Sequence, residues 1–377
     1  MGEHTTYVGL DVHKETIVVA VAFESGEVID GGTIRNRPEA IAKLVEKWGT
    51  EETGYVYEAG PCGYALYREL RKLGATCVIA APSKMERAPG DRVKTDKRDA
   101  KKLARQLRSG SIPTVWVPEP EDEALRDLTR ARQTAQEQLQ AAKNRVTKLL
   151  LRLDIRPSEG VKAWSRAYWD WIRSLVLSYP AQRVVLAEGL SAIQEAEARV
   201  DRLTKHVEEM AKTASRSKVI EGLLTMRGIG ILTATTLVAE LGDISRFESP
   251  RKLMSYTGLT PTEDSSGGRV RRGHISHVGN PHVRYVLGEM TWHHARPLTV
   301  GKKLQRQRKG QPREIVELAE RADGRLHRRY LRLIHRGKSA PAAATAVARE
   351  SLGFIWAIAR LAQGLAVEPP RRQPRAA

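Results

Sequence analysis

Four acidic residues near the start of the chain have the types and places that metal-dependent phosphodiester chemistry needs. They are Asp11, Glu58, Asp96 and Asp99. Carboxylates can hold two Mg²⁺ ions about 4 Å apart, where the ions activate an attacking oxygen and stabilise a leaving oxygen. Each acid alone has a plainer interpretation: Asp11 could end a strand in a turn, and Asp96 could cap a helix. Together, the four predict a Mg²⁺ site, most simply for two ions.

A second candidate group lies far along the chain, where two serines precede paired glycines and arginines. Ser265 and Ser266 each offer a hydroxyl, and glycine lets a phosphate approach the backbone closely. Arg269, Arg271 and Arg272 can neutralise charge that develops on phosphorus, so we count them as candidate nucleic-acid-binding residues. One of the serines could attack DNA, although the same residues are also typical of a flexible loop.

The chain is strongly basic, and most of its excess charge is C-terminal. Its 377 residues include 63 Lys or Arg against 44 Asp or Glu, a formal net charge of +19. From Ser266 to Ala377 the numbers are 23 and 7. Runs such as 302–309 and 327–329 can neutralise phosphates without reading base sequence. The pattern favours nucleic acid as the partner.

Composition also excludes several classes of protein. Apolar runs such as 17–23 are shorter than the roughly 20 residues of a membrane span, and the first residues have no signal-peptide pattern. Cys62 and Cys77 are too few for a disulfide framework or a cysteine-rich zinc site. The histidines at 274–294 have spacings that fit no usual metal pattern. We therefore expect a cytoplasmic protein with no membrane partner.

The four acids must be positioned by the elements of the first hundred residues. Hydrophobic patterns predict strands at 7–11, 16–23, 28–34, 55–57 and 76–80 and helices at 38–48, 64–73 and 96–108. This order implies a mixed sheet covered by helices, an α/β arrangement that RNase H-like folds share. Asp11 and Glu58 would each end a strand, and Asp96 and Asp99 lie three apart on one helix. The acids could thus converge on one edge of the sheet.

Two long helices are predicted after the prolines at 113, 118 and 120. Apolar residues follow heptad spacing over 125–153, with only Arg132 out of place, and again over 186–214. These runs predict a coiled-coil segment, folded as an antiparallel hairpin or paired with another protomer. The aromatic residues at 164–171 are interpreted as packing at the hairpin tip rather than as base-stacking groups.

A glycine-rich turn opens the mainly helical last part of the chain. Arg227, Gly228 and Gly230 lie between two apolar helical patterns, which resembles a helix-hairpin-helix element. Such a turn can offer backbone N–H groups to a phosphate, so these are candidate nucleic-acid-binding residues. A plain helical hairpin is the alternative. The whole pattern predicts three domains, at 1–115, 116–215 and 216–377.

Motifs along nearly the whole chain resemble the insertion-sequence "one-ten" family of transposases. They are Tyr7-Val-Gly-Leu-Asp-Val-His-Lys, Tyr57-Glu-Ala-Gly-Pro-Cys-Gly-Tyr, Gly90-Asp-Arg-Val-Lys-Thr-Asp-Lys-Arg-Asp-Ala, Arg227-Gly-Ile-Gly, Glu240-Leu-Gly-Asp-Ile-Ser-Arg-Phe, Tyr256-Thr-Gly-Leu-Thr-Pro and Ser266-Gly267-Gly268. The resemblance implies a RuvC-like N-terminal domain, whose Asp-Glu-Asp-Asp metal site corresponds to the four acids. It also implies a C-terminal transposase domain, whose nucleophilic serine corresponds to Ser266.

The resemblance implies partners as well. Family members are also called bridge recombinases, because a structured noncoding RNA pairs with both donor and target DNA. The composite site would form between protomers, which implies a homo-oligomer, either dimer or tetramer. The implied location is the cytoplasm of a bacterium or archaeon, in association with the nucleoid. The basic extension beyond Gly301 is longer than in some members and receives no role from the resemblance.

The predicted function is therefore that of an insertion-sequence transposase with a metal-bound acidic tetrad and a serine that becomes joined to DNA. One alternative is a RuvC-like junction resolvase or DNA invertase, in which water attacks and Ser266 only contacts phosphate. Another is a nonenzymatic nucleic-acid-binding assembly factor with an idle acidic cluster.

Overall fold

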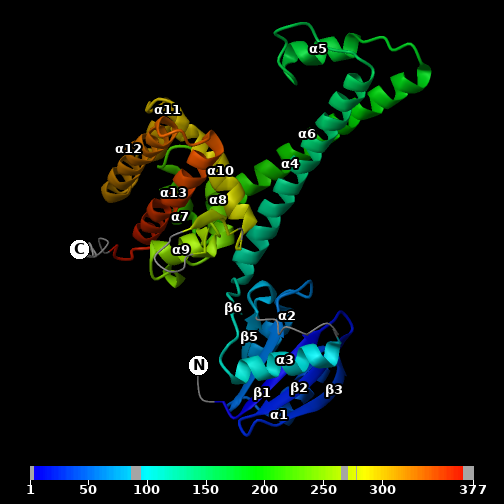
Figure 1. Ribbon diagram of the computed structural model, residues 1–377, viewed down its shortest axis with the longest axis vertical. Coiled ribbons are helices and arrows are strands. Elements are labelled where there is room, and N and C mark those ends of the chain that lie inside the picture. The colour runs from blue at the N-terminus through cyan, green and yellow to red at the C-terminus, as the bar shows by residue number, and fades with distance from the viewer. Residues whose placement is uncertain (1–3, 86–94, 265–270, 277, 368–377) are drawn as a thin grey trace. The chain divides into compact units, whose positions relative to one another are not determined.

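The computed structural model describes residues 4–85, 95–264, 271–276 and 278–367 (Figure 1). By their contacts, residues 1–117 form one compact unit and residues 118–377 form another. The long helical segment and the C-terminal helices thus belong to one unit by contact. The functional division at 1–115, 116–215 and 216–377 stays a prediction.

The N-terminal unit is a six-stranded mixed sheet with the order β3-β2-β1-β4-β5-β6. The strands are β1 Thr6–Val12, β2 Thr16–Phe23, β3 Val28–Arg35, β4 Thr53–Glu58, β5 Thr76–Ala80 and β6 Thr114–Val115. β1 pairs antiparallel with β2 on one side and parallel with β4 on the other. The antiparallel part of the sheet therefore meets the parallel part at β1. The predicted mixed α/β sheet is confirmed. The closer RuvC-like assignment stays a prediction, and β6 was not predicted.

Helices cover both faces of this sheet. Residues of α1 Pro38–Trp48 and α2 Ala65–Lys72 pack with Leu10 and Tyr57 in one core, whereas α3 Asp96–Arg108 packs with Val56 on the other face. Strands covered on both sides read as continuous apolar runs, and the interior of β2 is buried throughout. A short 3₁₀ turn, η1 Pro82–Lys84, follows β5.

Gly9 lets α3 lie directly on β1. A Cβ atom at this position would lie 2.2 Å from the Ala100 carbonyl oxygen and 2.6 Å from the Ala104 nitrogen. Only a residue without a side chain allows so close an approach. The contact lies two residues before Asp11 on the strand and one helical turn after Asp96 on the helix, so it sets where those two acids meet.

The second unit begins with two long helices that pack side by side. These are α4 Pro120–Arg152 and α6 Pro180–Thr213, with α5 Arg166–Ser174 between them in sequence (Figure 1). Arg132 Nε bonds Thr204 Oγ1 at 3.3 Å, and Lys143 Nζ lies 2.7 Å from Glu197 Oε1. Partner numbers fall on α6 as they rise on α4, so the pair is antiparallel. The coiled-coil assignment itself stays a prediction.

The aromatic cluster between the two helices packs as predicted. The ring centres of Trp164 and Tyr168 lie 5.0 Å apart, and those of Tyr168 and Trp171 lie 5.1 Å apart. Tyr168 and Ile172 are buried in the same core as Leu149 and Leu186. The rings are therefore committed to packing, which confirms the prediction.

The rest of the second unit is mainly helical, as predicted. Its elements are α7 Ser217–Leu224, α8 Ile231–Leu241, η2 Ile244–Arg246, α9 Pro250–Tyr256, β7 Pro261–Glu263, β8 Arg272–Ile275, α10 Pro281–Thr291, η3 Trp292–Ala295, α11 Lys302–Arg308, α12 Arg313–His335 and α13 Ala340–Ala362. α13 is the one described helix long and apolar enough to cross a membrane, with a mean hydropathy of 1.2 over the relevant window. It packs against α7, α9, α10 and α12, with Val347, Leu352 and Ile355 fully buried, so it is the central core helix of this unit.

Candidate active site

Strand register brings Asp11 and Glu58 to one edge and one face of the sheet. Leu10 pairs with Tyr57 in parallel register, so Asp11 and Glu58 are the next positions along adjacent strands. Leu10 and Tyr57 face the core under α1 and α2. Because side chains alternate along a strand, Asp11 and Glu58 face the side that α3 covers.

The first turn of α3 brings the other two acids to that side. Thr95 is the N-cap, and its hydroxyl accepts a hydrogen bond from the Arg98 backbone N–H at 3.4 Å. Asp96 and Asp99 both lie in the first turn, where the helix dipole favours negative charge. Asp99 is half-buried and Asp96 is exposed.

The acids repel one another across this edge. Burial raises the pKa of Asp11, His13 opposes that shift, and the charges of Asp96 and Asp99 raise the pKa further. Burial is the largest cause of the raised pKa of Asp11, and the two neighbouring carboxylates add to it although His13 opposes them. A bound divalent cation would relieve that repulsion.

His13 bridges two of the acids and was not among the predicted site residues. Its Nε2 lies 3.3 Å from Asp11 Oδ2 and 3.4 Å from Asp96 Oδ2. One potential ligand atom from each of these three residues lies within 4.8 Å of the other two. His13 follows Asp11 by two residues, so strand alternation could have indicated it from sequence. Its partner Asp96 is 83 residues away, and only the fold reveals that contact.

The residues at this edge fit a divalent cation. Carboxylate oxygens are ligands that Mg²⁺ and Mn²⁺ prefer, and Asp11 Oδ2 and Asp96 Oδ2 both lie near His13 Nε2. The charge of Asp99 also acts on Asp11. Glu58 reaches the group by strand register alone. The structure therefore brings Asp11 and Asp96 together beside His13, with Asp99 near Asp11, and the four-acid metal site stays a prediction.

In sequence, the predicted serine falls between β7 and β8, two strands that form a hairpin. β7 and β8 pair antiparallel, and the Asp264 N–H donates to the Arg271 carbonyl at 2.9 Å. Ser265, Ser266 and Arg269 fall within 265–270, outside the described residues. Arg271 is exposed at the end of this segment, and the backbone of Arg272 begins β8.

Two glycines form the neck of this hairpin. A Cβ at Gly258 would lie 2.3 Å from the Val278 carbonyl oxygen, and one at Gly279 would lie 2.2 Å from the Tyr256 carbonyl oxygen. Both glycines have positive φ angles, at +70° and +132°. The backbone just before the hairpin, at Gly258, therefore packs directly against the backbone just after it, at Gly279.

A buried ion pair anchors the residue that follows this neck. Glu240 on α8 is fully buried, and Arg130 on α4 bonds both of its carboxylate oxygens, at 2.7 and 2.9 Å. Asn280 Nδ2 donates to Glu240 Oε2 at 2.6 Å, and the Asn280 side-chain oxygen caps α10. Burial raises the pKa of Glu240, but the hydrogen bonds from Arg130 and Asn280 outweigh burial and leave that pKa lowered. Glu240 lies within one of the family motifs but was not among the predicted site residues.

The predicted phosphate-binding turn lies between α7 and α8, but part of it is already engaged. Gly228 has a φ of +81°, and a Cβ there would lie 2.7 Å from the Met290 carbonyl oxygen. The Arg227 N–H donates to Asp323 Oδ1 at 3.0 Å, so it is used inside the protein. Gly230 is the N-cap of α8 and has open space beside it. Nucleic-acid binding by this turn stays a prediction.

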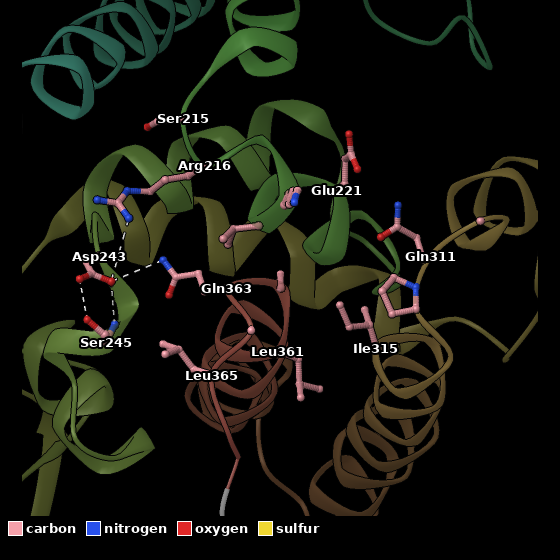
Figure 2. Close-up of a pocket in the computed structure, with 16 residues that line it drawn as sticks. Ser215, Arg216, Glu221, Asp243, Ser245, Gln311, Ile315, Leu361, Gln363 and Leu365 are labelled. Atoms are coloured by element: carbon pink, nitrogen blue, oxygen red, sulfur yellow. Dashed lines mark hydrogen bonds and ion pairs between the residues drawn. The ribbon is translucent and has the colours of Figure 1, made fainter.

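A hollow of about 910 Å³ lies in the second unit, away from these residues (Figure 2). Asp243 at its wall accepts hydrogen bonds from Ser245 Oγ at 2.5 Å and from Gln363 Nε2 at 3.4 Å, and Arg216 lies 4.0 Å away. The polar groups around Asp243 thus bind one another, and the hollow contains none of the predicted site residues.

Comparison with known proteins identifies the class. Residues 8–154 match the sequence model of a DEDD-type family described as "Transposase", and residues 220–304 match that of the "Transposase IS116/IS110/IS902 family". The chain is 38% identical over 361 residues to "Putative transposase y4qE" of Sinorhizobium fredii, covering 95% of this chain and 89% of the relative. It is 34% identical over 333 residues to "Transposase for insertion sequence element IS1533" of Leptospira borgpetersenii, covering 87% and 96%.

A more distant relative is named for a different activity. The chain is 26% identical over 200 residues to the "Pilin gene-inverting protein" of Moraxella bovis, covering 52% of each chain. The fold, the acidic edge and these matches together define a DNA transposase. The chain belongs to the IS110 family of transposases.

Proposed function

We propose that this transposase cleaves and rejoins DNA through a covalent serine–DNA intermediate, with Asp11, Glu58, Asp96 and Asp99 holding divalent cations, most simply two Mg²⁺ ions. The observation that supports this most strongly is the meeting of Asp11, His13 and Asp96, whose ligand atoms lie within 4.8 Å of one another. The DEDD-type match over residues 8–154 supports divalent-metal use.

The protein groups have distinct parts in this proposal. When bound, the cations supply positive charge for the attacking and leaving oxygens. Ser266 Oγ forms a bond to phosphorus as a deoxyribose oxygen leaves with a proton, and rejoining reverses the exchange. Arg269, Arg271 and Arg272 neutralise charge on the phosphate. His13 orients Asp11 and Asp96.

The neck of the hairpin has a positioning role in this proposal. Glu240 receives Arg130 from α4 and Asn280 from the start of α10. The helices α4 and α8 thus hold the chain directly after the hairpin. The close backbone contacts at Gly258 and Gly279 hold the two ends of the hairpin together. A nucleophile must be held within a fraction of an ångström of its productive position, and a rigid neck serves that requirement.

The proposal extends to partners. A noncoding bridge RNA would pair with donor and target DNA, leaving the basic protein to hold backbones. The working form would be a homo-oligomer, a dimer or tetramer, in which the acids of one protomer meet the serine of another. Arg227, Gly228 and Gly230 would contact nucleic acid, and the protein would act in the cytoplasm in association with the nucleoid.

Trapping the intermediate tests the proposed chemistry. Wild-type protein incubated with element-end DNA, bridge RNA and Mg²⁺ should yield a denaturation-resistant protein–DNA adduct, and Ser266→Ala should lose it. Ser265→Ala is the matched control and should keep the adduct. If Ser265→Ala lost the adduct and Ser266→Ala kept it, the nucleophile would be Ser265 instead.

Water-mediated cleavage, as in a junction resolvase or DNA invertase, is the second candidate. One relative is named a pilin gene-inverting protein, which supports the invertase activity in this candidate. In that case DNA would be cut with no adduct from either the wild type or the variants. If no Mg²⁺-dependent cutting of DNA were detected, the result would instead support a nonenzymatic assembly factor.

A further inference from the structure

The outer face of α12 carries a stripe of arginines. Buried residues of this helix recur on one side, at Ile315, Ala319, Ala322, Leu326 and Tyr330. Arginines recur with the same spacing on the opposite side, where all four are exposed: Arg321, Arg325, Arg328 and Arg332. A helix turns about 100° per residue, so these four lie within an arc of about 60°.

Only part of this charge is neutralised within the protein. Glu350 on α13 pairs with Arg325 and lies 3.6 Å from Arg329. Across the described ranges, no carboxylate lies within ion-pair distance of Arg321, Arg328 or Arg332. Residues 321–338 include seven Lys or Arg and one acid, Asp323. Asp323 is buried and pairs with Arg308 at 2.6 Å, so it does not offset the stripe.

The spacing of the stripe suits the backbone of a nucleic-acid duplex. Successive arginines are about 4.5–6 Å apart along the helix axis, and the four span about 17 Å. A duplex carries one phosphate per about 3.4 Å of axis on each strand, so the stripe spans about five phosphates. The one tyrosine of α12, Tyr330, is buried, and the helix has no Phe or Trp. Single strands are held by stacking on aromatic rings, so this face favours a duplex.

We propose that α12 binds the phosphate backbone of double-stranded DNA through its arginine stripe. DNA is the substrate of a transposase, and α12 lies outside both segments that match family models, 8–154 and 220–304. The inference rests on the DNA-handling part of the proposed function and on neither the nucleophile nor the metal. It gives the basic C-terminal extension a role.

Salt-dependent binding of the full-length protein tests this surface. Anisotropy of a labelled duplex DNA of unrelated sequence, measured in EDTA, gives the slope of log affinity against log salt concentration. The triple variant Arg321→Gln/Arg328→Gln/Arg332→Gln should make that slope shallower by about 2–3, since each phosphate contact contributes about 0.9. The triple Arg→Lys variant keeps the charge and should keep the slope. Glu350→Gln should make the slope steeper, because it frees Arg325 and Arg329.

Each outcome decides the question. An unchanged slope in the Gln triple variant, with thermal unfolding like that of the wild type, would overturn the proposal. If the Gln triple variant lost affinity only for duplex RNA or single-stranded DNA, the assignment of double-stranded DNA to this surface would be wrong. Since EDTA prevents cleavage, failure of the serine or metal proposal leaves this measurement unaffected, and a failure here leaves the adduct experiment unaffected.

Discussion

The two units treat their acidic residues in opposite ways. In the N-terminal unit, Asp11 lies near Asp96 and Asp99, and its pKa is raised by burial and by their charges. In the second unit, Glu240 is fully buried, yet its pKa is lowered because Arg130 and Asn280 bond it. One unit gathers like charges at an accessible edge, and the other neutralises a charge inside its core.

This difference separates charges that serve chemistry from charges that serve structure. A buried acid with matched donors holds elements together, and removing it leaves its arginine partners without their countercharge. Acids that repel one another at a sheet edge weaken the fold when they are ionised. They can contribute to function when a bound cation neutralises their charge. Mutations should therefore act on stability in one unit and on ligand binding in the other.

The largest expected effect is the loss of the Glu240 anchor. Glu240→Ala leaves Arg130 and the buried Arg126 without their carboxylate, so it should lower the free energy of unfolding by roughly 3–5 kcal/mol. Asp11→Asn in EDTA should leave that energy unchanged or raise it, because it removes a repelling charge. Denaturant unfolding measures both, with exposed Glu221→Ala as control. Equal losses of unfolding free energy in Glu240→Ala and Asp11→Asn would contradict the proposed difference between the two units.

A smaller effect concerns pH. His294 is fully buried, and its pKa falls from 6.5 to about 4 because of burial and the nearby Arg227, His293 and His327. The folded state therefore holds this imidazole neutral, and stability is lost as pH falls through 6.5 toward 4. Between pH 7 and pH 5 the loss should be on the order of 2 kcal/mol.

Unfolding measured at both pH values checks this. His294→Phe should flatten the dependence, while His206→Gln, at an exposed position on α6, should leave it as in the wild type. An equal dependence in wild type and His294→Phe would assign the acid sensitivity to other groups.

Local patterns predicted the N-terminal unit closely because its elements follow one another along the chain. The strands at 16–23 and 76–80 and the helices at 38–48 and 96–108 match the observed bounds. β6 was missed because two residues between prolines have no periodicity to detect, and it pairs with β5 only through the tertiary fold.

The residues that sequence analysis missed depend on distant partners. Spacing could place Asp96 and Asp99 on one helix, but it could not show that Gly9 admits that helix or that His13 reaches Asp96. Likewise, Glu240 meets Arg130 from 110 positions before it and Asn280 from 40 positions after it. The helical pattern of α8 marks that position as buried but does not name those partners.

Metal binding to the full-length protein tests the central claim, that the acids of the N-terminal unit lack countercharge until a cation binds them. Mn²⁺ binding followed by electron paramagnetic resonance should weaken at least about tenfold in Asp11→Asn, since a lost ligand carboxylate removes both charge and an oxygen donor. Asp30→Asn is the matched control, because Asp30 already pairs with Lys97 at 2.8 Å, and it should bind Mn²⁺ as the wild type does. Equal Mn²⁺ affinity in wild type and Asp11→Asn would contradict the account.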